Sequence, residues 1–470
     1  MKERHMERVI CFLYFTGFAV LAVILAVFQP HVDFVSEVPA SPPDEYFRML
    51  IPKYICEHGT LPTGLEEEVR ILGCGFSYGL YNVLPYIIQG YVMRFVSLFT
   101  DSPLALLYAG RMVNVASGLL MAWVVYLLGR RLFTDGRFRW IFCFAVMYLP
   151  ENLFVHTYIN TDSCCLLSTA IILHALVWAY QEDFGFGNSA LLSLGIILCA
   201  LSYYNAYGYI LCAILLFIGY FVKKTSSGRD FDWRNMLKYG MFISALVIAG
   251  AGWWFIRAYF VLDGDILGLR TKERLALLYA LDETSPLNTY RARGVSIFRM
   301  LKENRFFQCL YDSFIAAFGS LSIRGDRWTY LSYKLLFGAG ILGGVLGWIP
   351  GRESRRAFLP DAKKADGRRI FFHLNMILCI LLPLAVMIRY AYTMDYQHQG
   401  RYMLPALIPI MYYTVRGIER LAAVRWKTYK LPSWLVNAGV AFALFIAVGS
   451  SFFMVFIQAL PIYRQLGVLP

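Results

Sequence analysis

Long apolar runs alternate with short polar segments along most of the chain. A transmembrane α-helix needs about 20 mostly apolar residues to cross the hydrocarbon core of a bilayer. The pattern therefore predicts an all-α polytopic membrane protein with about 11 transmembrane helices, within a range of about 10 to 13. The predicted spans are residues 9–28, 104–128, 139–158, 163–181, 189–203, 207–222, 236–258, 330–349, 370–391, 403–420 and 434–458.

A further apolar run, residues 81–99, is interrupted by Pro85, Gln89 and Arg94. Cytoplasmic loops carry an excess of Lys and Arg. If 81–99 lies in the membrane interface rather than across it, every strongly basic segment falls on one side. We therefore expect 81–99 to be interfacial, the N-terminus to be cytoplasmic and the C-terminus to lie outside. The predicted inner segments are 1–8, 129–139, 181–188, 223–235, 351–369 and 416–432.

Composition agrees with a multi-pass protein of the cell membrane. Hydrophobic residues make up 58% of the chain and charged residues 16%, whereas a soluble domain carries about 25% charged residues. The net charge of +13 could indicate a nucleic-acid partner, but the basic residues sit in short loops between apolar runs, as membrane orientation requires. The ten cysteines show no CxxC or CxxH spacing, so neither a zinc site nor a disulfide framework is indicated.

Two of the predicted outer segments are long, and both contain charges, tyrosines and apolar stretches. The first is 29–103, which includes the interfacial run, and the second is 259–329. We expect both to form interfacial helices that cover a cavity at the outer face. Residues 459–470 are expected to form a short outer tail, so that 1–470 is a single transmembrane domain.

The first candidate for chemistry is the acidic pair Asp44 and Glu45, which follows Pro42 and Pro43 in the first outer segment. Adjacent acids often occupy a helix N-terminus, where they interact favourably with the helix dipole. Alternatively, one carboxylate acts as a general base, or orients one, over a membrane cavity. The residues by themselves leave both interpretations open.

A second group of ionisable residues lies at a predicted outer boundary and consists of Glu151, His156 and Asp162. Ionisable groups are uncommon at such a position unless they are paired or functional. Asp162 is also well placed to cap the helix predicted at 163–181. Capping and a functional role both remain possible interpretations of Asp162.

A third group is the motif Gln-Gly-Arg-Tyr-Met-Leu-Pro at 399–405, preceded by His398. Arg401 lies at the mouth of the span predicted at 403–420. A guanidinium matches the geometry of phosphate oxygens, and a helix N-terminus also favours an anion. The alternative is an arginine that reaches toward lipid headgroups. Three further arginines near predicted outer span ends could either do the same or join Arg401 around a phosphorylated lipid: Arg111, Arg257 and Arg389.

The order of these features resembles the GT-C superfamily of integral-membrane glycosyltransferases. More narrowly, the chain is similar to a bacterial polytopic membrane-protein family of unassigned function. Members of that family carry Pro-Asp-Glu after the first span, an Asn-x-Asp pair near the middle and Gln-Gly-Arg-Tyr-x-Leu-Pro near the end. The matching residues are Pro43-Asp44-Glu45, Asn160-Thr161-Asp162 and the motif at 399–405. This last motif is the most specific of the three.

The resemblance implies a glycosyltransferase of the bacterial plasma membrane. Such an enzyme would move a sugar from a polyprenyl-phosphate-linked donor to a cell-envelope glycan, lipid or protein acceptor on the non-cytoplasmic face. Asp44 or Glu45 would be the catalytic base, and Glu151, His156 and Asp162 would orient the acceptor. The donor phosphate would be bound by Arg401, His398, Arg111, Arg257 and Arg389. No cofactor is required by the pattern, although Asp44, Glu45 and Asp162 could supply oxygen ligands to a divalent metal.

The chain departs from the pattern of this family near the acidic pair, and functions other than sugar transfer also fit the sequence, among them a non-catalytic membrane scaffold. Where relatives of the family carry a histidine a few residues after the acidic pair, this chain has Phe47 and Arg48. A lipid-linked oligosaccharide polymerase or ligase would use a similar cavity, but would require a diphosphate-linked glycan donor. A lipid or polysaccharide transporter or flippase often shows inverted repeats and charges near the midplane. No clear duplication is visible here and the charges cluster near one face, which favours one-sided chemistry.

Overall fold

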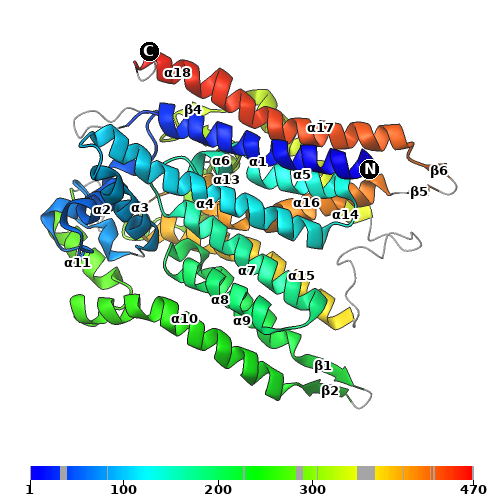
Figure 1. Ribbon diagram of the computed structural model, residues 1–470, viewed down its shortest axis with the longest axis horizontal. Coiled ribbons are helices and arrows are strands. Elements are labelled where there is room, and N and C mark those ends of the chain that lie inside the picture. Colours follow the sequence, from blue (N-terminus) through cyan, green and yellow to red (C-terminus); the bar gives the residue numbers. More distant parts are fainter. Residues whose placement is uncertain are drawn as a thin grey trace.

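The computed structural model describes residues 2–31, 40–81, 83–225, 228–281, 289–303, 305–346, 366–394, 396–423, 425–426 and 429–467. Its long helices lie side by side in one bundle (Figure 1). The bundle helices are α1 (Lys2–Phe28), α4 (Pro103–Leu132), α5 (Gly136–Met147), α6 (Pro150–Val155), α7 (Asp162–Glu182), α8 (Phe186–Ala200), α9 (Tyr207–Tyr220), α10 (Trp233–Val261), α14 (Arg327–Leu346), α15 (Asp366–Thr393), α16 (Leu407–Ala422), α17 (Ser433–Phe452) and α18 (Leu460–Gln465).

The prediction of an all-α polytopic membrane protein is confirmed. By length and composition, seven helices of the described part can cross a membrane: α1, α4, α7, α10, α14, α15 and the continuous helix Ser433–Gln465. Two predicted spans correspond to shorter apolar helices, Phe186–Ala200 and Tyr204–Tyr220. The two remaining predicted spans, 139–158 and 403–420, fall on helices with a break or a change of pitch.

Proline explains the first of these two cases. Proline has no backbone N–H and is tolerated in the first turn of a helix but not in its interior. Accordingly α5 ends at Met147, and α6 begins at Pro150. The prediction of one continuous helix over 139–158 is therefore wrong. In the second case, the 3₁₀ helix η7 (Gly400–Ala406) precedes α16 and contains Pro405.

The end of the chain differs from the prediction of a span at 434–458 followed by a tail. The helix α17 continues through the π-helical segment η8 (Phe453–Ala459) into α18. A π-helical segment adds a residue to a turn without ending the helix. Residues 460–465 are therefore helical and extend the last span.

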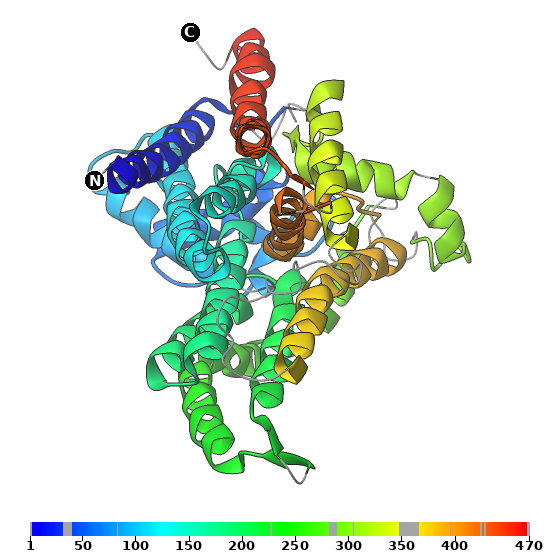
Figure 2. The same cartoon turned by 90° about the vertical axis from the view of Figure 1, so that its right-hand side faces the viewer.

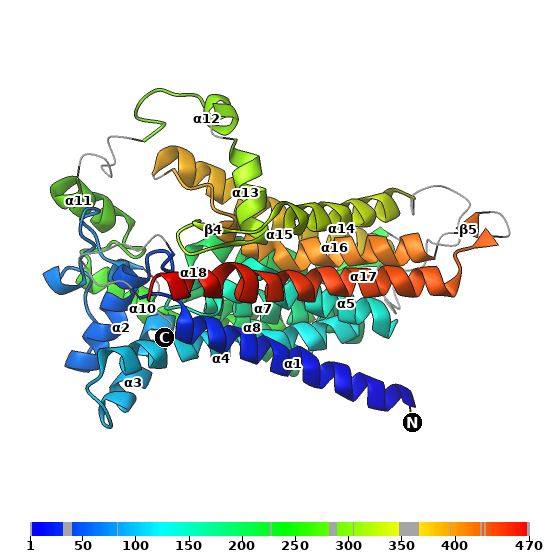
Figure 3. The same cartoon turned by 90° about the horizontal axis from the view of Figure 1, so that it is seen from above.

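Short elements gather toward one end of the bundle, which we call the α2 end (Figures 1 and 3). They confirm that both long predicted outer segments contain helices, whereas their place in the membrane interface stays a prediction. The elements are α2 (Glu45–His58), η1 (Glu67–Val69), η2 (Tyr78–Leu80), α3 (Leu84–Ser97), η3 (Tyr204–Ala206), α11 (Leu269–Tyr279), α12 (Ile297–Glu303), α13 (Phe306–Ile315) and the antiparallel strands β3 (Ala317–Phe318) and β4 (Ile323–Arg324).

The opposite end of the bundle collects predicted inner segments. It carries the start of α1 and two antiparallel hairpins, β1 (Val222–Thr225) with β2 (Gly228–Phe231) and β5 (Arg425–Trp426) with β6 (Tyr429–Lys430) (Figure 1). Ion pairs join three of these segments, because Arg131 lies 2.7 Å from Glu182 and Arg139 lies 2.8 Å from Glu7. Residues 351–365 of the predicted inner set lie outside the described residues. The assignment of this end to the cytoplasm stays a prediction.

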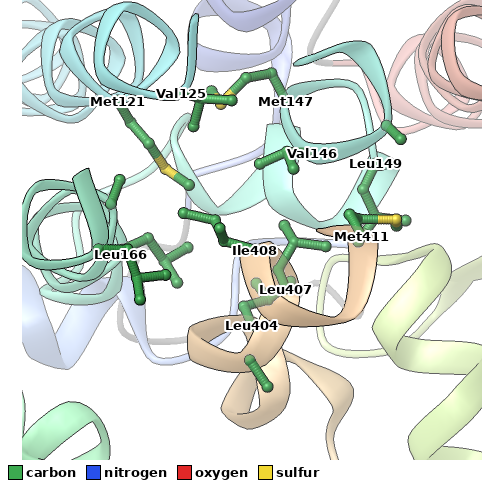
Figure 4. Close-up of a cluster of buried hydrophobic side chains, with 14 of the residues drawn as sticks. Met121, Val125, Val146, Met147, Leu149, Leu166, Leu404, Leu407, Ile408 and Met411 are labelled. Carbon is green, nitrogen blue, oxygen red and sulfur yellow. The ribbon is translucent and has the colours of Figure 1, made fainter. Parts of the chain in front are cut away.

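The segment formed by η7 and α16 lies near the centre of the bundle (Figure 2). Its side chains Leu404, Leu407, Ile408 and Met411 pack among Met121, Val125, Val146, Met147 and Leu166 from α4, α5 and α7 (Figure 4). On the other side of α16, a Cβ at Gly340, Gly343 or Gly417 would collide with the backbone of the facing helix. Small residues allow such close helix contact in membranes. The motif at 399–405 is thus joined to a helix that is closely packed on both sides.

Candidate functional site

Asp44 adopts an unusual backbone conformation immediately before α2. Its φ of 60° and ψ of 5° are left-handed, and its side chain makes no capping hydrogen bond to the helix. Instead, Asp44 Oδ2 accepts a hydrogen bond of 2.8 Å from Arg401 Nη2. Strained backbone of this kind persists where the surroundings hold it and often marks a functional site. The acidic pair therefore does lie at a helix N-terminus, as one interpretation predicted, but the Asp44 carboxylate pairs with Arg401 instead of bonding to the first turn of the helix.

The residues immediately before and after Arg401 are both held by contacts with other elements. Gly400 N donates a hydrogen bond of 2.7 Å to Ser313 Oγ, and a Cβ on Gly400 would collide with the backbone of Phe314. Asn205 donates a hydrogen bond of 2.7 Å to the main-chain oxygen of Tyr402. The main chain on either side of Arg401 is therefore held in place by contacts with other elements.

The guanidinium of Arg401 is incompletely paired. Its side chain is only 3% exposed, and Nη2 donates to Asp44 and to the hydroxyl of Tyr402, the latter at 3.1 Å. The nitrogens Nε and Nη1 are buried and have no hydrogen-bond partner among the described residues. Buried polar groups are almost always paired. The unpaired nitrogens therefore suit an acceptor-rich anion, for which guanidinium is well adapted.

The electrostatic surroundings keep Asp44 ionised. Burial by itself would raise the pKa of the Asp44 carboxyl, but the charges of Arg401 and Arg48 and the hydrogen bond from Arg401 outweigh this effect. The pKa of Asp44 is consequently held below its ordinary value. Because the Asp44 side chain is 38% exposed, a second molecule can reach this carboxylate.

Arg48 belongs to the same cluster and was missed by the sequence interpretation. It lies one helical turn after Asp44 on α2, with Nη1 3.6 Å from Asp162 Oδ2 and 3.3 Å from Thr161 Oγ1. Its guanidinium lies 5.0 Å from the ring centre of Tyr78. The available signal was the spacing, since residues four apart lie on the same face of a helix.

Asp162 does not cap α7. Instead, Asn160 Oδ1 accepts a hydrogen bond of 3.0 Å from Ser163 N in the first turn of α7. The Asp162 carboxylate is buried beside Arg48, and its Oδ2 has no hydrogen-bond partner among the described residues. Of the two interpretations of Asp162, the functional one therefore agrees better with the structure.

Glu45 points away from this cluster, although it is adjacent to Asp44. Its buried carboxylate accepts hydrogen bonds from Arg111 Nε at 2.9 Å, from Arg111 Nη2 at 2.5 Å and from Ile159 N at 2.8 Å. Arg111 uses its other N–H groups on the main-chain oxygens of Ala26, Gln29 and Pro30. This pair ties α1, α2, α4 and the bend before α7 together. The prediction that Arg111 binds phosphate is therefore wrong, and of the two acids Asp44 is the better candidate for the base.

The three other predicted phosphate ligands, Arg257, Arg389 and His398, have surroundings that do not include Arg401. Arg257 Nη2 donates to the main-chain oxygens of Leu61 and Pro62, at 3.4 and 2.8 Å. Arg389 is exposed on α15. The His398 ring lies 5.0 Å from the ring of Tyr396, and burial followed by the charge of Arg324 lowers the pKa of His398. In the described part of the chain these residues make no contact with Arg401 or Asp44, so the structure does not bring them together with Arg401, and their role in phosphate binding stays a prediction.

The remaining two predicted residues, Glu151 and His156, differ in whether they lie beside the cluster around Arg401. Glu151 is buried, its Oε2 accepts a hydrogen bond of 3.1 Å from Ala317 N, and it interacts electrostatically with Arg401 and Asp162. His156 instead lies inside the bundle, with Nδ1 2.6 Å from Ser163 Oγ and its ring 5.9 Å from the ring of Phe18. Glu151 therefore borders the cluster, whereas His156 makes no contact with Arg401 or Asp44 among the described residues, and its role stays a prediction.

The polar residues of the cluster do not form a metal site. No group of three or more His, Cys, Asp or Glu side chains that could hold a metal occurs among the described residues. Of the three oxygen ligands considered from the sequence, Glu45 is bound to Arg111 and Asp44 to Arg401. The three acids considered as possible metal ligands therefore do not form one such group among the described residues.

The cluster sits in a fold shared with membrane glycosyltransferases. The chain is similar to the archaeal oligosaccharyltransferase AglB from Archaeoglobus fulgidus, solved in complex with an inhibitory peptide and a dolichol-phosphate. The TM-score is 0.53 and the sequence identity is 14%, and the match covers 95% of this chain and 56% of that one. It is also similar to the arabinofuranosyltransferase AftD from Mycobacteria, with a TM-score of 0.50, 13% identity and coverage of 95% and 28%. This chain thus spans about half of the first protein and about a quarter of the second.

These similarities confirm that the fold is of the GT-C glycosyltransferase type. The chain itself belongs to the DUF2142 family of predicted membrane proteins, whose model matches residues 66–411. No curated protein matches it in sequence.

Proposed function

We propose that this protein is a membrane glycosyltransferase that transfers a sugar from a polyprenyl-phosphate-linked donor to a cell-envelope glycan, lipid or protein. The observation that carries the proposal is the state of Arg401. Its buried guanidinium holds the candidate base Asp44 with one nitrogen, and two further nitrogens have no partner among the described residues. The GT-C fold and the dolichol-phosphate bound in the AglB structure support a lipid phosphate as the ligand.

In the proposed reaction, Asp44 removes the proton from an acceptor hydroxyl, and the resulting oxygen attacks the anomeric carbon of the donor sugar. The bond between this carbon and the phosphate oxygen breaks, and the electron pair leaves with polyprenyl phosphate. Arg401 stabilises the negative charge that grows on this leaving group. A base with a well-placed partner for the developing charge is the minimum that such a transfer requires.

Donor binding also strengthens the base in this arrangement. Arg401 and Arg48 hold the pKa of Asp44 low while the phosphate is absent, so that the carboxylate is then a weak base. A phosphate placed on Arg401 adds negative charge near Asp44 and opposes this effect. The sugar acceptor is therefore activated best when the donor is already bound.

The remaining roles follow from position. Glu151 borders the Asp44–Arg401 pair and orients the acceptor, while Glu45 and Arg111 hold α2 in place. The α2 end of the bundle is the non-cytoplasmic face, which agrees with the excess of Lys and Arg in the segments of the opposite end. The N-terminus then lies in the cytoplasm of a bacterial cell, and the C-terminus lies outside.

The test is sugar transfer in membranes supplied with polyprenyl-phosphate sugars. Asp44→Asn and Arg401→Ala should each abolish transfer, because one removes the base and the other the phosphate ligand. Arg137→Ala serves as the control, since it removes an exposed arginine of the predicted inner segment 129–139 that is paired with Asp135. It should transfer sugar at the wild-type rate.

Folding is checked separately by size-exclusion chromatography of each purified variant. Transfer at the wild-type rate by folded Asp44→Asn or Arg401→Ala protein would refute the proposal. A polymerase or ligase would be indicated instead if only diphosphate-linked glycans served as donors.

A further inference from the structure

Arg401 is not the only residue at the α2 end with buried polar atoms that lack a hydrogen bond, although Arg401 is ion-paired with Asp44 and Asp162 with Arg48. Arg48 Nε, Asp162 Oδ2 and the hydroxyl of Tyr158 are also buried without a hydrogen-bond partner among the described residues. The Tyr158 side chain is fully buried and interacts electrostatically with Arg401, Asp162, Arg48 and Glu151. These unpaired atoms come from α2, α7, η7 and the bend before α7, so that they meet only in the folded protein.

Such a concentration of unpaired atoms indicates a missing polar ligand. Proteins pair nearly all buried polar groups, and leaving one unpaired is unfavourable. The ligand must accept hydrogen bonds from the arginine nitrogens and donate one to the Asp162 carboxylate. A phosphate oxygen only accepts, whereas a sugar hydroxyl both donates and accepts. The set therefore matches a sugar joined to a phosphate better than it matches a phosphate.

We propose that Asp162, Tyr158 and Arg48 bind the hydroxyl groups of the donor sugar while its phosphate lies on Arg401. This inference rests on the proposed function and names the residues that select the sugar. It reassigns Asp162 from the acceptor, as the sequence suggested, to the donor. The exposures agree, since the Asp162 side chain is 7% exposed and the Asp44 side chain is 38% exposed. The buried side of the cluster thus holds the donor, and the acceptor approaches Asp44 from the accessible side.

Tyr158→Phe is the sharpest variant, because it removes only a hydroxyl that has no partner in the described structure. The free protein should fold at least as well as the wild type, since an unpaired buried group is lost. Tyr463→Phe in α18 is the matched control, because its hydroxyl is also buried without a partner among the described residues. Asp162→Asn provides a second, independent change of the same subsite.

The measurement compares the binding of bare polyprenyl phosphate with that of polyprenyl-phosphate hexoses and pentoses, by native mass spectrometry of purified protein. The wild type should bind at least one sugar-bearing lipid more tightly than the bare lipid. Tyr158→Phe should reduce that advantage about tenfold, the size expected for one hydrogen bond. Affinity for the bare lipid should stay unchanged, and Tyr463→Phe should match the wild type for both lipids. Asp162→Asn should likewise lose affinity only for the sugar-bearing lipid.

The outcomes separate the inference from the proposed function. If the wild type binds both kinds of lipid equally, or if Tyr158→Phe and Asp162→Asn both behave like the control, the sugar subsite is refuted and the phosphate site stands. If the wild type binds no polyprenyl phosphate with or without sugar, the proposed function itself fails.

Discussion

The adjacent acids Asp44 and Glu45 should respond in opposite ways when each is converted to its amide. Glu45→Gln removes the charge of a carboxylate that is 5% exposed and paired with Arg111 through two nitrogens. Asp44→Asn removes the charge of a carboxylate that is 38% exposed and paired with Arg401 through one nitrogen. We expect the first change to destabilise the fold and the second to abolish sugar transfer.

The contacts indicate how large the difference is. Removing one partner of a buried ion pair costs about 3–5 kcal/mol, because the other charge remains buried and uncompensated. In Glu45→Gln the new amide group also directs N–H toward the N–H groups of Arg111. The Asp44 carboxylate is 38% exposed, so water screens part of its attraction to Arg401, and Asn keeps a carbonyl oxygen for Arg401 Nη2. Because Arg401 itself stays buried, Asp44→Asn should cost more than the loss of a fully exposed pair but less than Glu45→Gln.

The assay is the half-life of each detergent-solubilised protein at a fixed elevated temperature, measured as the fraction that remains monodisperse. A half-life is appropriate because large membrane proteins commonly unfold irreversibly. Asp44→Asn should remain monodisperse longer than Glu45→Gln and should fail in the transfer assay, whereas Glu45→Gln should have the shortest half-life. Equal half-lives for the two variants, or a Glu45→Gln protein as durable as the wild type, would refute the structural role of Glu45.

Two further variants test the surroundings of the site. The base acts in its ionised form, so the low pKa of Asp44 should keep kcat/KM high until the pH falls below the ordinary range of aspartate. Arg48→Gln removes a cation, raises the pKa of Asp44 and should move this acid limb to higher pH; an unmoved limb would contradict the assigned coupling. Gly400→Ala forces a methyl group against neighbouring backbone and should weaken binding of polyprenyl phosphate by displacing Arg401, while Gly439→Ala, which points into open space, should bind it normally.

The positions of most long spans were determined by the sequence itself. A bilayer demands about 20 apolar residues in any crossing helix, whatever its neighbours. The runs at 236–258 and 370–391 accordingly coincide with α10 and α15. Pro150 was visible as well, but a long apolar run gives no sign of whether a proline bends a helix or ends it. The break between α5 and α6 therefore had to be seen in the structure.

Part of the site was also predictable. Ionisable residues near membrane boundaries are rare enough to stand out, and this drew attention to Asp44, Asp162 and Arg401. In the structure, Asp44 forms an ion pair with Arg401, and Asp162 forms one with Arg48. Arg48 could have been included from its helical spacing to Asp44, whereas Tyr158 could not, because a tyrosine at the end of an apolar run carries no comparable signal.

Only the tertiary structure decided which charged residues are left for a ligand. Successive side chains at the start of a helix point about 100° apart, so Asp44 meets Arg401 while Glu45 meets Arg111. The other partners of Arg111 are main-chain oxygens of Ala26, Gln29 and Pro30, and a carbonyl oxygen is present at every residue. An arginine whose N–H groups are used by main-chain oxygens elsewhere in the protein therefore looks the same in sequence as one that can bind a phosphate. The difference lies in which nitrogens remain unpaired after packing.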